Sequence, residues 1–107
     1  MTSGRIPAPS YRKVYAEGRS VSNRLLVLYY LADPTGMKMG VSVPGRLGKA
    51  TVRNKLRRRV KEAFRRFPPD AVSGQFVFIV RRGATGAAFQ DLVDSMRELF
   101  KRMATVW

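Results

Sequence analysis

The segment from Gly48 to Arg66 constrains the fold most strongly, because its apolar residues recur with the period of an α-helix. At roughly 100° per residue, these side chains fall within about one third of the helix circumference. Such an apolar stripe packs a surface helix against a hydrophobic core, and Pro68-Pro69 predicts where the helix ends. The stripe consists of Val52, Leu56, Val60, Ala63, Phe64 and Phe67.

The same helix is strongly basic, since residues 48–66 hold nine Lys or Arg side chains and one acid, Glu62. In helices stabilised by surface ion pairs, acids alternate with bases at i,i+4, whereas here only Glu62 can pair, with Arg58, Arg65 or Arg66. A solvated basic face is the alternative interpretation, but this much unpaired charge repels itself unless a polyanion binds. We therefore predict a nucleic-acid interface made of Arg46, Lys49, Arg53, Asn54, Lys55, Arg57, Arg58, Lys61 and Arg65.

The composition of the whole chain agrees with this prediction. Twenty-one basic and seven acidic residues give a net charge of +14 in 107 residues, and 45% of the residues are hydrophobic, which is enough for a core. We expect a mobile arm over residues 1–9 and a single domain over residues 10–107. The chain has no run of about 18 apolar residues to span a membrane and no apolar signal-peptide core. The expected location is therefore the cytoplasm.

The residue types that are missing exclude several kinds of chemistry. The chain has no Cys and no His, which removes zinc sites with those ligands, thiol nucleophiles and imidazole acid–base catalysis. Asp91, Asp94 and Glu98 share one helix face, so a metal-dependent nuclease is geometrically conceivable. Ion pairs on a solvent-facing helix, with the bases three or four residues further on, explain the same spacing. We predict no catalytic residues in this chain.

The order of elements predicts an α+β fold. We expect helices over residues 11–17 and 89–103 besides the basic one, with Ser10 and Thr51 as N-caps. Apolar β-favourable runs predict strands over residues 24–31, 37–43 and 75–80, the first two joined by a turn at Asp33-Pro34-Thr35-Gly36. The predicted order is α-β-β-α-β-α, a two-layer sandwich with the helices on one face of a small sheet.

The run GVSVPGRLGKATVRNKLRRRVKEAFR resembles the signature of the bacterial ribonuclease P protein subunit. The resemblance covers residues 10–103. The family usually carries Arg-Asn-Arg, whereas this chain has Lys55 as the third residue of that motif. The family usually carries Ser-Lys-Lys where this chain has Pro44-Gly45-Arg46. The matching residues are Arg46, Gly48, Ala50, Arg53-Asn54, Arg57-Arg58, Lys61-Glu62 and Ala63-Phe64, with Tyr11, Tyr15, Gly18, Asn23-Arg24, Tyr29 and Phe76 to Arg81 outside the run.

This resemblance implies a division of labour within a ribonucleoprotein. The catalytic RNA subunit would hydrolyse the phosphodiester with Mg²⁺, and one monomeric protein per RNA would help it to bind precursor tRNA and remove the 5′ leader. The family's fold implies a left-handed βαβ crossover around the basic helix, against the usual hand. It also implies a leader-binding cleft between the first helix and the sheet, for which the candidate residues are Tyr11, Tyr15, Tyr29, Phe76 and Phe78.

Two interpretations remain open beside that one. A structural ribosomal RNA-binding protein would have the same composition and the same basic helix, and only the Arg-Asn motif and the order of elements distinguish the two. For Phe76 and Phe78, which lie in an apolar strand, packing in the core is the alternative to leader binding. The tyrosines differ, because a phenolic hydroxyl favours a partly wet position.

Overall fold

The computed structural model describes residues 8–67 and 73–106, and over these it contains three α-helices and four β-strands in the order α-β-β-β-α-β-α. This confirms the predicted α+β class. The elements are α1 (Tyr11–Glu17), β1 (Arg19–Ser22), β2 (Leu26–Leu31), β3 (Met37–Ser42), η1 (Gly45–Leu47), α2 (Ala50–Phe64), β4 (Gly74–Val80), η2 (Arg82–Ala84) and α3 (Phe89–Val106).

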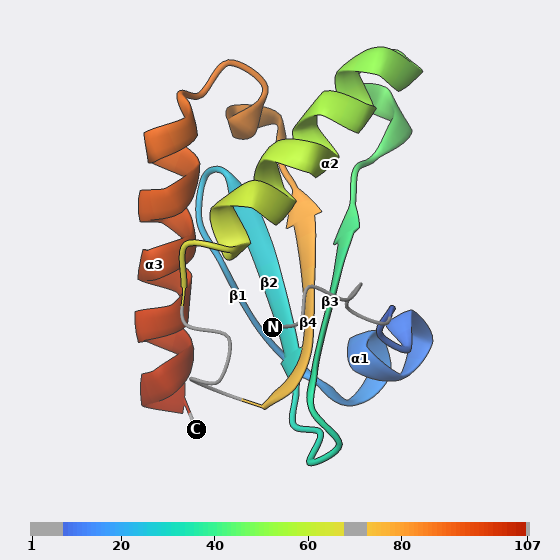
Figure 1. Ribbon diagram of the computed structural model, residues 1–107, viewed down its shortest axis with the longest axis vertical. Helices are drawn as coiled ribbons and strands as arrows, with labels where there is room; N and C mark the ends of the chain where they lie inside the picture. Colours follow the sequence, from blue (N-terminus) through green and yellow to red (C-terminus); the bar gives the residue numbers. More distant parts are fainter. Residues whose placement is uncertain (1–7, 68–72, 107) are drawn as a thin grey trace.

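The four strands form one mixed sheet in the order β1-β2-β4-β3. Strands β1, β2 and β4 pair antiparallel, whereas β3 and β4 pair parallel and are connected through α2. In Figure 1, both β3 and β4 point upward, α2 crosses in front of the sheet, and the chain moves from β3 to β4 on its left. The β3-α2-β4 crossover is therefore left-handed, as the resemblance implied.

Strand β1 is the element that the predicted order lacks. It spans four residues and pairs with β2, with Val21 opposite Leu28. Val21 is half-buried and the other three residues of the strand are exposed, so the short polar sequence carries no strand signal. The strand forms because it can pair with the free edge of β2. This is a tertiary contact, which the local sequence does not indicate.

The two faces of the sheet carry different helices. Leu28 and Phe78 are cross-strand neighbours and belong to the core cluster formed with α2 and α3. Successive side chains in a strand point to opposite faces, so Tyr29 and its partner Val77 face away from that core, toward α1. The prediction that the helices lie on one face was wrong for α1, because both faces of β2 and β4 are apolar enough to bury.

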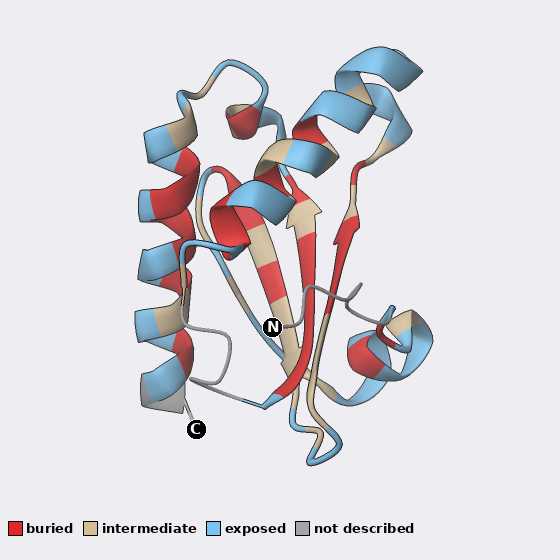
Figure 2. Cartoon of the chain, in the orientation of Figure 1, coloured by how far each residue is buried: buried red, intermediate tan, exposed pale blue. Residues whose placement is uncertain are grey.

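The predicted apolar stripe of α2 and the apolar side of α3 form the helical layer of the core, and the strands supply the rest. Figure 2 shows α3 buried along the side that faces the sheet and exposed on the outer side, as its spacing of apolar residues predicts. In α2, Leu56, Val60, Ala63 and Phe64 are buried. Phe67, which follows the helix, is half-buried. Val52 is 43% exposed, because the first turns of α2 project beyond the strands (Figure 1).

Some predictions fall at or outside the limits of the described residues. Residues 1–7 of the predicted arm and the proline stop at residues 68 and 69 lie outside them, whereas Pro9, also assigned to the arm, is buried. The N-cap position of α2 is Lys49 rather than Thr51, which lies inside the helix. Within residues 8–67 and 73–106, no helix is long and apolar enough to cross a membrane.

The Asn23 side chain joins the β1–β2 turn to α3. The Asn23 Oδ1 accepts hydrogen bonds from the backbone N–H groups of Leu25 and Leu26, each at 3.1 Å, and from Ser95 Oγ at 2.8 Å. Its Nδ2 donates to Ser95 O at 3.1 Å and to Glu98 Oε1 at 2.9 Å. Because both ends of the amide are paired, Asn23 fixes the position of the hairpin against the helix.

Candidate nucleic-acid interface

The basic side chains of α2 divide into two flanks on either side of its buried stripe. Lys55 and Arg59, spaced i and i+4, share the flank toward α3, and Arg66 follows just after the end of the helix. Arg59 donates from a guanidinium nitrogen to Ala87 O at 3.2 Å, and the Arg66 guanidinium lies 5.0 Å from the centre of the Phe89 ring. Both cations are thus occupied within the fold. Lys55 therefore lies on the opposite side of α2 from most of the other residues predicted to bind RNA.

The opposite flank holds five of the predicted contacts together. Asn54, Arg57, Arg58, Lys61 and Arg65 follow the spacing i, i+3, i+4, i+7 and i+11, which places them side by side along the helix. We call these five residues the open flank of α2. Arg57 donates to Asn54 Oδ1 at 2.8 Å, and Arg65 pairs with Glu62 at 3.1 Å. In the part of the chain that the structure describes, Arg58 and Lys61 are exposed and have no hydrogen-bond or ion-pair partner.

The loop before α2 extends this basic surface. Arg46 and Lys49 are exposed, and the described residues offer neither of them a hydrogen bond or an ion pair. Arg53 is half-buried, and its Nε donates to Gly48 O at 3.1 Å. That hydrogen bond ties the helix to the end of the loop, so Arg53 has a role in the fold as well as a position at the surface.

Three tyrosines meet on the opposite face of the sheet. The ring centres of Tyr11 and Tyr15 in α1 are 6.3 Å apart, and those of Tyr15 and Tyr29 in β2 are 5.0 Å apart, both in edge-on geometry. Tyr15 is 40% exposed, and the other two are half-buried. We call these three residues the tyrosine cluster. Partly exposed rings of this kind suit stacking with unpaired bases.

Two small residues of β3 adjoin the tyrosine cluster, and neither was predicted. Burial raises the pKa of Tyr15 above its ordinary value, and a side-chain hydrogen bond with Ser42 lowers it by a smaller amount. The hydroxyl of Tyr15 therefore stays protonated near neutral pH. A Cβ on Gly40 would overlap the hydroxyl oxygen of Tyr11. Alternate residues of β3 lie on the same face of the sheet, which is the only sequence signal that could place Gly40 and Ser42 beside the tyrosines. Using it requires the pairing register of β3 with β4.

The structure does not bring Phe76 and Phe78 to the tyrosine cluster. Phe76 is 3% exposed and Phe78 is fully buried, and both rings contact Phe64 of α2 and Phe100 of α3. They lie on the α2 and α3 face of β4, so their inclusion among the leader-cleft residues was wrong. The physical reason is that β4 is apolar on both faces, and its sequence does not indicate which residues share a face with Tyr29.

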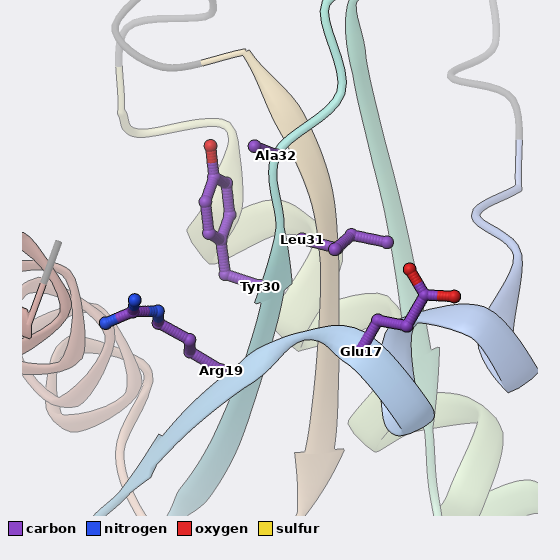
Figure 3. A pocket seen from close by; sticks show the side chains of 5 residues that line it. All are labelled: Glu17, Arg19, Tyr30, Leu31 and Ala32. Carbon is purple, nitrogen blue, oxygen red and sulfur yellow. The ribbon is translucent and has the colours of Figure 1, made fainter.

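A hollow elsewhere on the molecule does not coincide with either surface. It has a volume of about 450 Å³ and is lined by Glu17, Arg19, Tyr30, Leu31 and Ala32. Figure 3 shows Tyr30 and Arg19 on one side of this region and Glu17 on the other, with their charged groups directed apart. Single-stranded nucleic acid binds open aromatic surfaces and basic grooves. Base stacking on the tyrosine cluster therefore requires no enclosed cavity.

The acidic residues of α3 are engaged in contacts within the fold. Asp91 Oδ2 accepts from the Ala88 N–H at 3.2 Å, Asp94 pairs with Arg97 at 3.1 Å, and Glu98 accepts from Asn23. Among the described residues, no three His, Cys, Asp or Glu side chains are grouped to hold a metal ion. Of the ion pairs that the spacing predicted, Asp94–Arg97 is present, whereas Glu98 bonds to Asn23.

One acidic residue gives an expected pH dependence of stability. Hydrogen bonds from the side chain and backbone of Thr35, and from Lys38, hold the pKa of Asp33 well below its usual range. A carboxyl whose folded pKa is lowered contributes stability above its unfolded pKa of about 4, and that stability is lost as the pH falls below it. We expect the Asp33→Asn variant to lose less stability than the unmodified chain on acidification. Urea unfolding between pH 7 and pH 3 measures this difference, and parallel curves would contradict it.

Known proteins resemble this chain over most of its length. The family model described as Ribonuclease P matches residues 7–104. The Ribonuclease P protein component of an Exiguobacterium species is 39% identical over 98 residues, covering 91% of this chain and 85% of that protein. The Ribonuclease P protein component of Clostridioides difficile is 36% identical over 104 residues, covering 94% of this chain and 91% of that protein.

Solved structures share the fold. The Staphylococcus aureus RNase P protein matches with a TM-score of 0.79 and 26% identity, covering 87% of each chain. The Thermotoga maritima RNase P protein matches with a TM-score of 0.77 and 28% identity, covering 87% of this chain and 90% of that one. These findings confirm the predicted resemblance and decide against the ribosomal interpretation. By its sequence over most of its length and by its fold, this chain belongs to the bacterial ribonuclease P protein family.

Proposed function

We propose that this chain, as a subunit of the ribonuclease P holoenzyme, binds the catalytic RNA through the open flank of α2 and the 5′ leader of precursor tRNA through the tyrosine cluster. The single observation that carries the first half is the exposed charge of Arg58 and Lys61, which have no partner among the described residues, on a helix whose other cations are partly occupied. Side chains of this kind neutralise backbone phosphates.

In this function the chemistry belongs to the RNA subunit. Phosphodiester hydrolysis would use Mg²⁺ bound by the RNA, and no side chain of this protein would act as acid, base or nucleophile. The protein's contribution is to binding. Its two surfaces lie on opposite faces of one sheet, so the RNA subunit and the leader can be bound at the same time without competing for the same residues. We expect the assembled enzyme to act in the cytoplasm, with one protein per RNA.

The leader-binding half is tested by removing one aromatic ring. We expect Tyr15→Ala to weaken the holoenzyme's affinity for precursor tRNA with a leader of several nucleotides by roughly tenfold, because one stacked base is worth about 1–3 kcal/mol. Affinity for mature tRNA is expected to be unchanged. Tyr15→Phe is the matched control, since it keeps the ring and removes the hydroxyl bonded to Ser42. Equal losses for both ligands would show that Tyr15 supports the fold instead.

A further inference from the structure

Helix α1 carries two of the three clustered tyrosines but has little to hold it in place. It spans seven residues, of which Val14 is buried. A helix of this length is not stable in water through its own propensity. Tertiary contacts must therefore hold the helix against the sheet. A single buried valine does little to fix the rotation of the helix about its axis or its position along the sheet.

A buried glutamine of β4 supplies a polar attachment at the start of the helix. Gln75 is 6% exposed and lies on the face of the sheet that α1 covers. Its Oε1 accepts a hydrogen bond from the backbone N–H of Ser10 at 2.7 Å, and its Nε2 donates to Asp33 Oδ2 at 3.2 Å. Asp33 is itself fixed by Lys38 Nζ at 3.1 Å and by the Thr35 N–H at 2.9 Å.

These contacts form one continuous chain from the β2–β3 turn through β4 to the residue before α1. A buried amide that is paired at both ends has a single low-energy orientation, because turning it would leave a donor and an acceptor unpaired. Ser10 directly precedes Tyr11, whose hydroxyl oxygen fits over β3 only because residue 40 is glycine. A small displacement of the helix start would therefore move Tyr11 out of its place.

We propose that Gln75 is a positioning residue for the tyrosine cluster, holding the start of α1 so that Tyr11 and Tyr15 stay beside Tyr29. The inference rests on the leader-binding function proposed above and adds a residue that does not itself touch RNA. If the docked position of α1 is only partly populated, apparent affinity for the leader falls by the same fraction. Losing both hydrogen bonds of Gln75 is expected to reduce it roughly tenfold, the equivalent of about 1.4 kcal/mol.

The test uses Gln75→Met, which keeps the length of the side chain and removes both hydrogen bonds. The matched control is Val80→Ala, a cavity in the same strand on the face covered by α2 and α3. Each variant is assembled with the ribonuclease P RNA, and its affinity is measured for precursor tRNA with a long leader and for mature tRNA. Amide hydrogen exchange of Val14 and Gly18, whose N–H groups bond to Ser10 O and Val14 O, reports on α1 directly.

We expect Gln75→Met to lose about tenfold in affinity for precursor tRNA alone, with faster exchange at Val14 and Gly18. Val80→Ala is expected to lower stability without changing the ratio of the two affinities. If Tyr15→Ala loses leader affinity but Gln75→Met does not, or if exchange in α1 is unchanged, the positioning role is wrong. Loosening of α1 by Gln75→Met, with no selective loss in Tyr15→Ala, would support the attachment and overturn the leader-binding function.

Discussion

Replacing Asn23 by alanine is expected to destabilise the fold by about 2–4 kcal/mol. The substitution removes the three hydrogen bonds that Oδ1 accepts and the two that Nδ2 donates. Each hydrogen bond contributes about 0.5–1.5 kcal/mol net, and a buried group left unpaired costs more. Leu26 is fully buried, so its N–H is shielded from water. The free energy of unfolding from urea titration measures the effect.

Ser95→Ala is the control for this prediction, because it removes one hydrogen bond to the Asn23 side chain and leaves the backbone contacts in place. Its cost is expected to be about 1 kcal/mol. The difference between the two variants isolates the contribution of Asn23 to the β1–β2 turn. A loss below about 1 kcal/mol in Asn23→Ala would mean that the turn is held by its strands and not by this side chain.

Asn23 also shows what a resemblance can and cannot indicate. Asn23-Arg24 contributed to the family resemblance without a stated role, and no local pattern connects residue 23 to residue 95. The contact exists because β1 turns into β2 beside α3, and β1 itself was not predicted. A motif that matches an RNA-binding family is therefore not automatically part of the RNA-binding surface, since some of its residues maintain the fold.

The parts of the fold that follow from one-dimensional periodicity were predictable. Most residues of the apolar stripes of α2 and α3 are buried, because an amphipathic helix has a single apolar side. Val52 is exposed, and Phe67, Phe89 and Phe100 are half-buried. The sheet was harder, since β2 and β4 are apolar on both faces and their register decides which side chains meet. This is why Tyr29 was placed with α1 correctly and Phe76 and Phe78 were not.

The candidate interface shows the same limit. Net charge and the basic helix predicted a polyanion surface, but they did not separate Arg59 and Arg66 from Arg58 and Lys61. That division depends on Ala87, in the loop before α3, and on Phe89, at the start of α3, which contact Arg59 and Arg66. Likewise, no sequence pattern indicates that Gln75 is buried, because its two partners lie 65 and 42 residues away along the chain.

This division of α2 leads to the prediction with the largest effect on binding. We expect the double variant Arg58→Ala, Lys61→Ala to bind the ribonuclease P RNA roughly 10- to 100-fold more weakly, because it removes two charge-assisted phosphate contacts. Each lost phosphate contact lowers the slope of log affinity against log salt by about 0.7–0.9. The slope is therefore expected to fall by roughly 1.4–1.8, measured by titration at several salt concentrations.

The matched control is the double variant Arg59→Ala, Arg66→Ala, which changes the same helix and removes the same two positive charges. These cations already contact Ala87 O and the Phe89 ring, so their loss is expected to affect stability more than the salt slope. A general effect of net charge would change both double variants equally. Equal salt slopes in the two variants would therefore contradict the assignment of the open flank, because only local phosphate contacts can distinguish two sides of one helix.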